Sequence, residues 1–347
     1  MLDSLALAAQ QPGNPPKEQF FNLWRPMSDT DYPWTGMLFG APILGVWYWC
    51  TDQYIVQRTL SAKDVQNARR GALFAGYLKL LPVFIFFIPG VIAYALLQQG
   101  ELQFSMANAD QALPALITNF LPTGLKGIAI AGLLAALMSS LSSAFNSSST
   151  LLTIDFYKQR KPDASEKDLV RFGQWATIVL VLVSLGWIPF MRTLMDGGIF
   201  NYLQSVQAYI SPPIAAVFLF GLFYKWINAR GAISALWVGF AIGIFRLVTE
   251  FLSKEGSLVV AEDSFLGLFL GINFLHFALF LFIICAAILL LVSRTSPPQP
   301  PEMLELVTFQ KNGAATKLSP SKDVWLTVVL ILLVLLIWYF FSPLGVA

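Results

Sequence analysis

The stretch GMLFGAPILGVWYWCTDQ, Gly36–Gln53, is apolar enough to lie in a bilayer but contains residues that interrupt a helix. Gly40, Pro42 and Gly45 fall within six positions, where glycine weakens a helix and proline cannot donate to the carbonyl one turn earlier. Backbone groups freed in this way are costly in hydrocarbon unless they line a cavity or meet other protein. The stretch therefore predicts a membrane helix that is broken at a functional position.

The rest of the chain is also suited to a bilayer. Of its 347 residues 56% are hydrophobic and 12% are charged, with a mean hydropathy of +0.65, whereas a soluble domain is about one quarter charged. A span needs roughly 20 apolar helical residues. Runs of this length predict an all-α integral membrane protein with about eight transmembrane helices, at 34–57, 72–98, 125–157, 171–191, 199–224, 231–252, 264–293 and 323–342.

The distribution of basic residues predicts the orientation. Fifteen lysines and arginines lie in one alternating set of connections and five in the other, and basic residues are retained in the cytoplasm. Both termini are therefore expected outside. We expect an external segment at 1–33, a transmembrane bundle at 34–293, a proline-rich cytoplasmic linker at 294–322, and a last helix, appended to the bundle, at 323–347.

Several classes of function are disfavoured. A net charge of +2, with no basic stripe, does not suit nucleic-acid binding. There is no Ser/His/Asp set, P-loop or dinucleotide fingerprint, so an enzyme is not expected. Cys50 and Cys285 lie in apolar runs and are expected to be buried, and His276 has no partners at zinc-ligand spacing.

Two further spans contain helix-breaking residues. The second span contains Pro82 and Pro89, and the fifth contains the pair Pro212 and Pro213. Broken spans within one bundle are the best sequence indication of a transporter binding site.

A serine-rich run, Gly132–Tyr157, contains seven serines and two threonines. Ala136, Ser139 and Ser140 stand at i, i+3 and i+4, so a carbonyl freed near Ala136 and two hydroxyls would face one point. Three hard oxygens suit Na⁺, with carbonyls of another, unwound helix completing its shell. The alternative is that the small residues let helices pack closely. Spacing alone leaves both interpretations open.

Three other residues are candidates for contacts with a polar solute. Lys79 lies about eight residues into the second span, Gln204 precedes the proline pair, and Tyr48 stands between two tryptophans. A lysine can snorkel to the interface, a glutamine near the start of a span can be interfacial, and aromatic residues can face lipid. These alternatives also stay open.

Five long segments stand out in order along the chain: WYWCTDQYIVQRTLSAKD (Trp47–Asp64), GYLKLLPVFIFFIPGVIA (Gly76–Ala93), LMSSLSSAFNSSSTLLTIDFY (Leu137–Tyr157), NYLQSVQAYISPPIAAVFL (Asn201–Leu219) and GIFRLVTEF (Gly243–Phe251). They closely resemble segments that occur in the same order in the sodium/glucose cotransporters of the sodium:solute symporter family. The resemblance covers roughly residues 30–255.

The resemblance implies roles for particular residues. It places the inner gate tyrosine at Tyr48 and the sugar-contacting residues at Lys79 and Gln204. It also places the sodium ligands at Ala136, through its backbone oxygen, and at Ser139 and Ser140, which agrees with the face deduced from spacing. Gly45 stands where members often have a polar residue, and Gln207 where the glucose type often has threonine, so the resemblance implies a sugar or a related polyol such as inositol without selecting among them.

The resemblance further implies the LeuT-type inverted-repeat fold, in which two five-helix repeats surround a site at the middle of the membrane. The first five spans would form the second repeat and three helices would follow it. The first repeat, with the unwound helix that completes the sodium site, would lie outside this sequence. The expected function is sodium-coupled symport by alternating access, with this chain as the C-terminal part of the transporter.

Two alternatives belong to other classes. One is a solute-sensing membrane module of the same fold, and the other is a truncated fragment that inserts without transporting. A soluble signalling domain would favour the sensor, and this sequence has none. The expected location is the plasma membrane, and the short chain suits a bacterial inner membrane.

The predicted orientation can be tested by cysteine labelling in a background without Cys50 and Cys285. We expect an impermeant thiol reagent added outside intact cells to modify Asn108→Cys but not Asp163→Cys, because the connection 99–124 is predicted to be external and 158–171 cytoplasmic. Permeabilised cells provide the control in which both positions react. Labelling of position 163 alone in intact cells would contradict the predicted orientation and indicate the opposite one.

Overall fold

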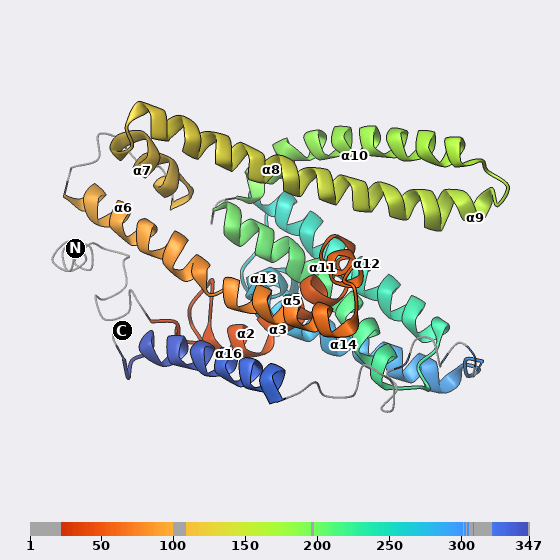
Figure 1. The fold of residues 1–347 in the computed structure, drawn as a ribbon. Helices are drawn as coiled ribbons and strands as arrows, with labels where there is room; N and C mark the ends of the chain where they lie inside the picture. The colour runs from red at the N-terminus through yellow and green to blue at the C-terminus, as the bar shows by residue number, and fades with distance from the viewer. Residues whose placement is uncertain are drawn as a thin grey trace. The chain divides into compact units, whose positions relative to one another are not determined.

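A computed structural model of the protein describes residues 22–99, 109–195, 198–300, 302, 304, 308 and 321–345. Every regular element within these ranges is a helix, which confirms the all-α prediction (Figure 1). Most of the predicted external segment 1–33, part of the connection 99–124 and most of the predicted linker 294–322 lie outside the described residues. The chain forms two compact units, unit 1 from Met1–Glu101 with Gly197–Ala347 and unit 2 from Leu102–Asp196.

Seven helical segments among the described residues are long and apolar enough to cross a membrane. They are Val65–Leu97, Thr123–Arg160, Glu166–Leu194, Ile199–Phe223, Ala229–Lys254, Phe274–Thr295 and Asp323–Phe340. The predicted first span is not among them, because it is divided into α2 (Trp34–Phe39) and α3 (Ala41–Cys50). The seven segments and this divided helix correspond to the eight predicted spans.

The division of the first span occurs at Gly40, where another helix comes close. The backbone carbonyl of Leu275, on α14 (Phe274–Thr295), lies 2.2 Å from the position that a Cβ of residue 40 would take. Any larger residue would therefore push the two helices apart. Pro42 follows in the first turn of α3, where its missing N–H costs little.

The core of unit 1 is formed by three long helices: α11 (Ile199–Phe223), α12 (Ala229–Lys254) and α14. The prediction that Pro212 and Pro213 break the fifth span is wrong, since α11 continues through both residues. Both prolines are fully buried, and a Cβ at Gly239 of α12 would lie 2.5 Å from the Cβ of Pro213. The proline pair therefore contributes to the close packing of α11 against α12 in the core of unit 1.

The second span is interrupted where its prolines predicted. Helix α5 (Val65–Leu78) ends before Pro82, a π-helical segment η2 (Val83–Phe87) follows, and α6 (Ile88–Gln98) begins one residue before Pro89. A π-helical turn places carbonyls out of the regular α-helical pattern and is frequent at functional positions. Between α3 and α5 lies the short helix α4 (Gln53–Leu60), which Asp52 caps by accepting a hydrogen bond from the Tyr54 amide.

The buried cation Arg246 lies on α12 and is only 3% exposed. Its guanidinium donates to the backbone carbonyls of Phe269 at 3.0 Å, Leu270 at 3.3 Å and Ile272. These carbonyls belong to the end of the short helix α13 (Phe265–Gly271) and to its connection with α14. Arg246 therefore holds this connection against the core.

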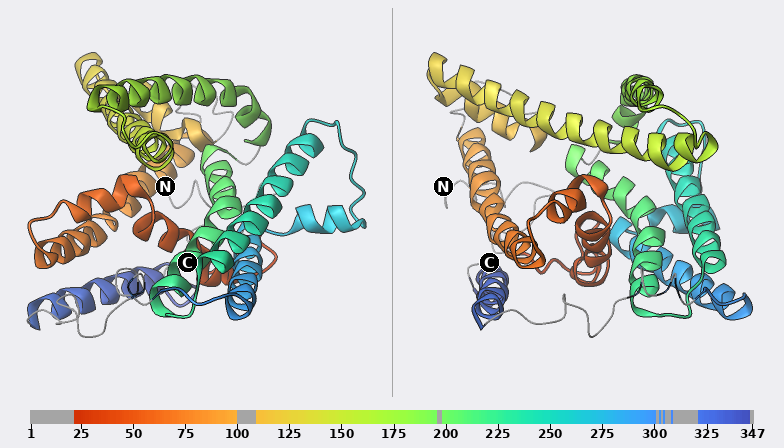
Figure 2. Two further views of the ribbon diagram at one scale, coloured as in Figure 1. Left: turned by 90° about the vertical axis from the view of Figure 1, so that its right-hand side faces the viewer. Right: turned by 45° about the vertical axis from the view of Figure 1, so that its right-hand side comes forward.

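The last span, α16 (Ser321–Phe340), lies beside α5 within unit 1 (Figure 2). Arg70 of α5 and Asp323 of α16 form an ion pair of 3.1 Å. Helix α16, which the sequence analysis described as appended to the bundle, therefore packs against α5.

Unit 2 is built around two long antiparallel helices, α8 (Thr123–Leu151) and α10 (Glu166–Leu194), which lie side by side (Figure 1). The 3₁₀ turn η3 (Ala109–Gln111) and α7 (Ala112–Phe120) precede α8. The π-helical segment η4 (Leu152–Tyr157) and the turn α9 (Lys158–Arg160) follow it. Ser165 and Asp168 begin α10 with a capping box in which each side chain bonds the backbone of the other.

The close contact between α11 and α12 predicts that Gly243→Ala destabilises the protein. A Cβ at residue 243 would lie 2.1 Å from the backbone carbonyl oxygen of Tyr209, so one of the two helices must move. Overpacking of this kind costs about 1–3 kcal/mol. Thermal unfolding in detergent should show a lower midpoint for Gly243→Ala.

The matched control is Gly221→Ala on α11, where an added Cβ meets nothing within 4 Å. This variant should be neutral or slightly more stable, because alanine is favoured over glycine in helices by about 1 kcal/mol. Equal midpoints for the two variants would contradict the close contact.

Candidate functional site

The structure brings two of the predicted solute-binding residues together. The Lys79 ammonium nitrogen lies 5.7 Å from the ring centroid of Tyr48 and 5.5 Å from that of Trp49. Tyr48 and Trp49 belong to the end of α3, and Lys79 directly follows α5. Both distances fall within the range of cation–π attraction. The local sequence arguments treated Tyr48 and Lys79 separately, because nothing in their spacing showed that they meet.

This arrangement has the chemistry expected of a polyol contact. The rings of Tyr48 and Trp49 meet edge to face, with centroids 5.4 Å apart. Aromatic faces can pack against the C–H surface of a sugar, and an ammonium group offers three hydrogen-bond donors to its hydroxyls. Trp49, one of the two tryptophans beside Tyr48 in the sequence, joins Tyr48 beneath the cation.

Gln204 lies on α11, one turn after Asn201. Asn201 accepts a hydrogen bond from the Tyr32 hydroxyl, which ties the start of α11 to the segment before α2. Gln204 is half-buried, and its amide makes no hydrogen bond to the residues that the structure describes. Among these residues no hydrogen bond joins Gln204 to Lys79 or to Tyr48. Helices α11 and α3 do pack together, since Leu44 and Ala208 belong to the same buried cluster.

The predicted sodium ligands lie on α8 in unit 2. Ala136, Ser139 and Ser140 share one face of this helix, and all three are exposed within the chain. The helix is regular from Thr123 to Leu151, so the carbonyl of Ala136 is not freed by a break as the sequence argument supposed. A carbonyl oxygen in a helix retains a second lone pair, which can still face an ion.

The serine-rich run divides into two parts with different surroundings. Ser149 is buried and donates to the Gly173 carbonyl on α10 at 2.8 Å, and Thr153 donates to the Ser149 carbonyl at 2.8 Å. The packing interpretation therefore accounts for this later part of the run. Ser139 and Ser140 make no such hydrogen bond among the described residues, and both are exposed.

The two groups of candidates belong to different units. Tyr48, Lys79 and Gln204 lie in unit 1, and the three predicted sodium ligands lie in unit 2. His276, which has no partners at zinc-ligand spacing in the sequence, is half-buried, and its Nε2 lies 2.7 Å from the Thr35 hydroxyl of α2.

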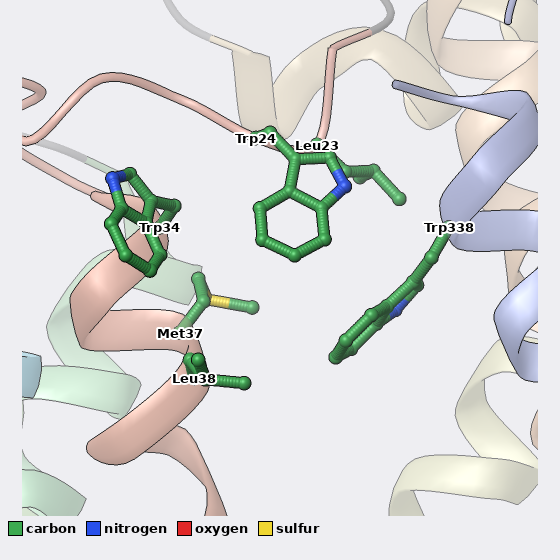
Figure 3. A pocket seen from close by; sticks show the side chains of 6 residues that line it. All are labelled: Leu23, Trp24, Trp34, Met37, Leu38 and Trp338. Atoms are coloured by element: carbon green, nitrogen blue, oxygen red, sulfur yellow. The ribbon is translucent and has the colours of Figure 1, made fainter. Parts of the chain in front are cut away.

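An apolar cavity of about 110 Å³ lies between the segment before α2, α2 itself and α16 (Figure 3). Trp24 and Trp338 meet edge to face across it, with centroids 5.8 Å apart. Solute sites combine apolar surface with a few placed polar groups. The residues around this cavity provide no charge, carbonyl or amide side chain for hydroxyl groups: Leu23, Trp24, Trp34, Met37, Leu38 and Trp338. The cavity therefore does not suit a sugar.

Comparison with known proteins matches residues 6–239 to the model of the sodium:solute symporter family. Among similar curated proteins, sodium/glucose cotransporter 1 of Sus scrofa is 40% identical over 296 residues, covering 82% of this chain and 45% of that protein. The same cotransporter of Ovis aries is 38% identical over 294 residues, covering 82% and 44%. Sodium/myo-inositol cotransporter 2 of Homo sapiens is 39% identical over 320 residues, covering 88% and 47%. The chain thus spans about half the length of these relatives.

Proposed function

The chain belongs to the sodium:solute symporter family, and from this premise we propose that it forms part of a transporter that couples inward Na⁺ movement to uptake of a sugar or related polyol. The observation that most favours a hydroxylated solute is the Lys79 ammonium above the rings of Tyr48 and Trp49. No covalent chemistry is required, because the ion gradient drives an equilibrium between outward-open and inward-open states.

The proposal assigns the solute contacts to Lys79, Tyr48 and Gln204. Lys79 and Tyr48 form one end of the contact surface, and Gln204 contributes an amide from α11. The names of the relatives include a glucose cotransporter and a myo-inositol cotransporter, which differ in solute but share a ring bearing several hydroxyls. An ammonium, an aromatic face and an amide recognise those shared features.

The proposal assigns Na⁺ to the face of α8 formed by the Ala136 carbonyl and the hydroxyls of Ser139 and Ser140. These groups are neutral oxygens on exposed residues, and the two hydroxyls make no hydrogen bond to the residues that the structure describes. Further carbonyls from an unwound helix would complete the shell, as half-helix ends do in other transporters.

We also propose a membrane arrangement for the chain. Residues 1–33 lie outside, 34–293 form the bundle, 294–322 form a cytoplasmic linker and 323–347 return to the outer side. The membrane is the plasma membrane, a bacterial inner membrane in the simplest case. The distribution of lysine and arginine supports this arrangement.

Ser140→Ala tests the sodium assignment in the complete transporter. The substitution keeps the small size that packing needs and favours the helix. It removes one hydroxyl from the proposed shell, so we expect the apparent Na⁺ affinity to fall about tenfold, at normal expression and thermal stability. Because coupling is reciprocal, apparent sugar affinity should also fall at limiting Na⁺ and recover in part as Na⁺ is raised.

Ser149→Ala is the matched control on the same helix. It removes the hydrogen bond to Gly173 and should lower thermal stability by about 1 kcal/mol while leaving the Na⁺ dependence of uptake unchanged. A wild-type Na⁺ dependence in well-expressed Ser140→Ala would contradict the sodium assignment and favour helix packing as the role of the whole serine-rich run.

Gln204→Ala tests the solute assignment. Loss of the amide strands a hydroxyl of the bound sugar, which costs about 1–3 kcal/mol, so apparent sugar affinity should fall roughly tenfold to a hundredfold. Sodium binding measured without sugar should be retained. Uptake kinetics with normal sugar affinity in both Gln204→Ala and Gln204→Glu would remove Gln204 from the site.

A further inference from the structure

Helix α16 contacts α5 at successive levels. Arg70 Nε lies 3.1 Å from the Asp323 Oδ1, and the Tyr77 hydroxyl donates to the Leu326 carbonyl at 2.6 Å. Residue numbers increase together along both helices, so the two run parallel. Phe87, at the end of η2, continues the series by meeting Phe341 edge to face, with centroids 5.9 Å apart. The contact therefore extends along most of α16.

The fit between the two helices depends on Gly76. A Cβ at this position would lie 2.8 Å from the Cδ2 of Leu330, so the leucine side chain occupies the space that glycine leaves. Small residues at membrane helix interfaces allow such close approach. Leu330 is half-buried, whereas its neighbour Ile331 is 53% exposed, which shows that α16 presents one particular face to α5.

The ion pair is asymmetric in its burial. The Asp323 side chain is 4% exposed and the Arg70 side chain 47% exposed. An exposed pair contributes little, but a buried carboxylate is costly to leave without its cation. Removing the Arg70 charge is therefore expected to destabilise the start of α16 more than the exposure of the arginine side chain alone would suggest.

Lys79 is directly linked to this contact. It follows the last residue of α5, three residues after Gly76, and its backbone N–H donates to the Ala75 carbonyl at 3.0 Å. The rings beneath its ammonium belong to α3, whereas the ion pair and the hydrogen bond of α16 are made with α5. A shift of α5 along α16 would thus move the ammonium relative to the rings.

We propose that Arg70 and Asp323 are a positioning pair, which seats α5 on α16 and so holds the Lys79 ammonium over Tyr48 and Trp49 to set the affinity for the solute. The proposal rests on the proposed function. It makes the last span part of the solute-binding machinery of the transporter.

Charge exchange in the complete transporter tests the pair. Arg70→Glu and Asp323→Lys should each raise the sugar KM about threefold to tenfold, with the maximal rate per molecule at the surface largely retained. The double variant restores an ion pair with opposite polarity and should return KM towards the wild-type value. The control Lys63→Glu changes the same charge on the exposed connection before α5 and should leave KM unchanged.

Thiol cross-linking provides a readout that is independent of transport. Gly76→Cys with Leu330→Cys should form a cross-link with a short bifunctional reagent, and Gly76→Cys with Ile331→Cys should not. Unchanged KM in both single variants, or no recovery in the double variant, would overturn the positioning role. Failure of the Gly76–Leu330 cross-link would overturn this proposal alone. Absence of Na⁺-dependent uptake by the wild type would overturn the proposed function, and with it the claim about affinity.

Discussion

A cation buried within the membrane helices organises unit 1. The Arg246 guanidinium lies 4.3 Å from the Phe277 ring centroid and 5.0 Å from that of Tyr209, so it meets both α14 and α11 from its own helix α12. A charge at this depth is expensive unless it is fully partnered. The rings and the carbonyls at the end of α13 partner the ring-facing guanidinium and its two terminal nitrogens, while Nε is buried without a hydrogen bond among the described residues. The position of α11, and hence of Gln204, depends on this cluster.

The requirement to satisfy polar groups also explains the serine-rich helix. Ser149 and Thr153 use their hydroxyls on carbonyls of α10 and of their own helix, as buried hydroxyls in an apolar setting do. Among the described residues, Ser139 and Ser140 make no such hydrogen bond. Two hydroxyls exposed on one face of a membrane helix need a partner of some kind. The proposed Na⁺, with a shell completed by another helix, would be such a partner.

The sequence predicted what local rules determine and missed what tertiary contact determines. The break at Gly40 and the irregular second span follow from glycine and proline chemistry. The prolines of α11 do not break this helix, because Gly239 of α12 leaves the space into which they pack. That space results from tertiary packing, which rules about local sequence do not describe. The meeting of Lys79 with Tyr48 and the seat of α16 on α5 join residues far apart in the chain. Periodicity has no information about such pairs.

The chemistry of the two candidate groups suits transport better than permanent binding. The proposed sodium ligands on α8 are one carbonyl and two hydroxyls, without a carboxylate among them. Conduction and transport require sites that bind strongly enough to fill and weakly enough to empty. A carboxylate would hold the cation more firmly and slow its release. Lys79 carries the only full charge among the six candidates, and it lies with the solute group in unit 1. On the proposed assignments, neutral oxygens would hold the ion and a cation would face the hydroxyls, so neither site would compete for the other's ligand.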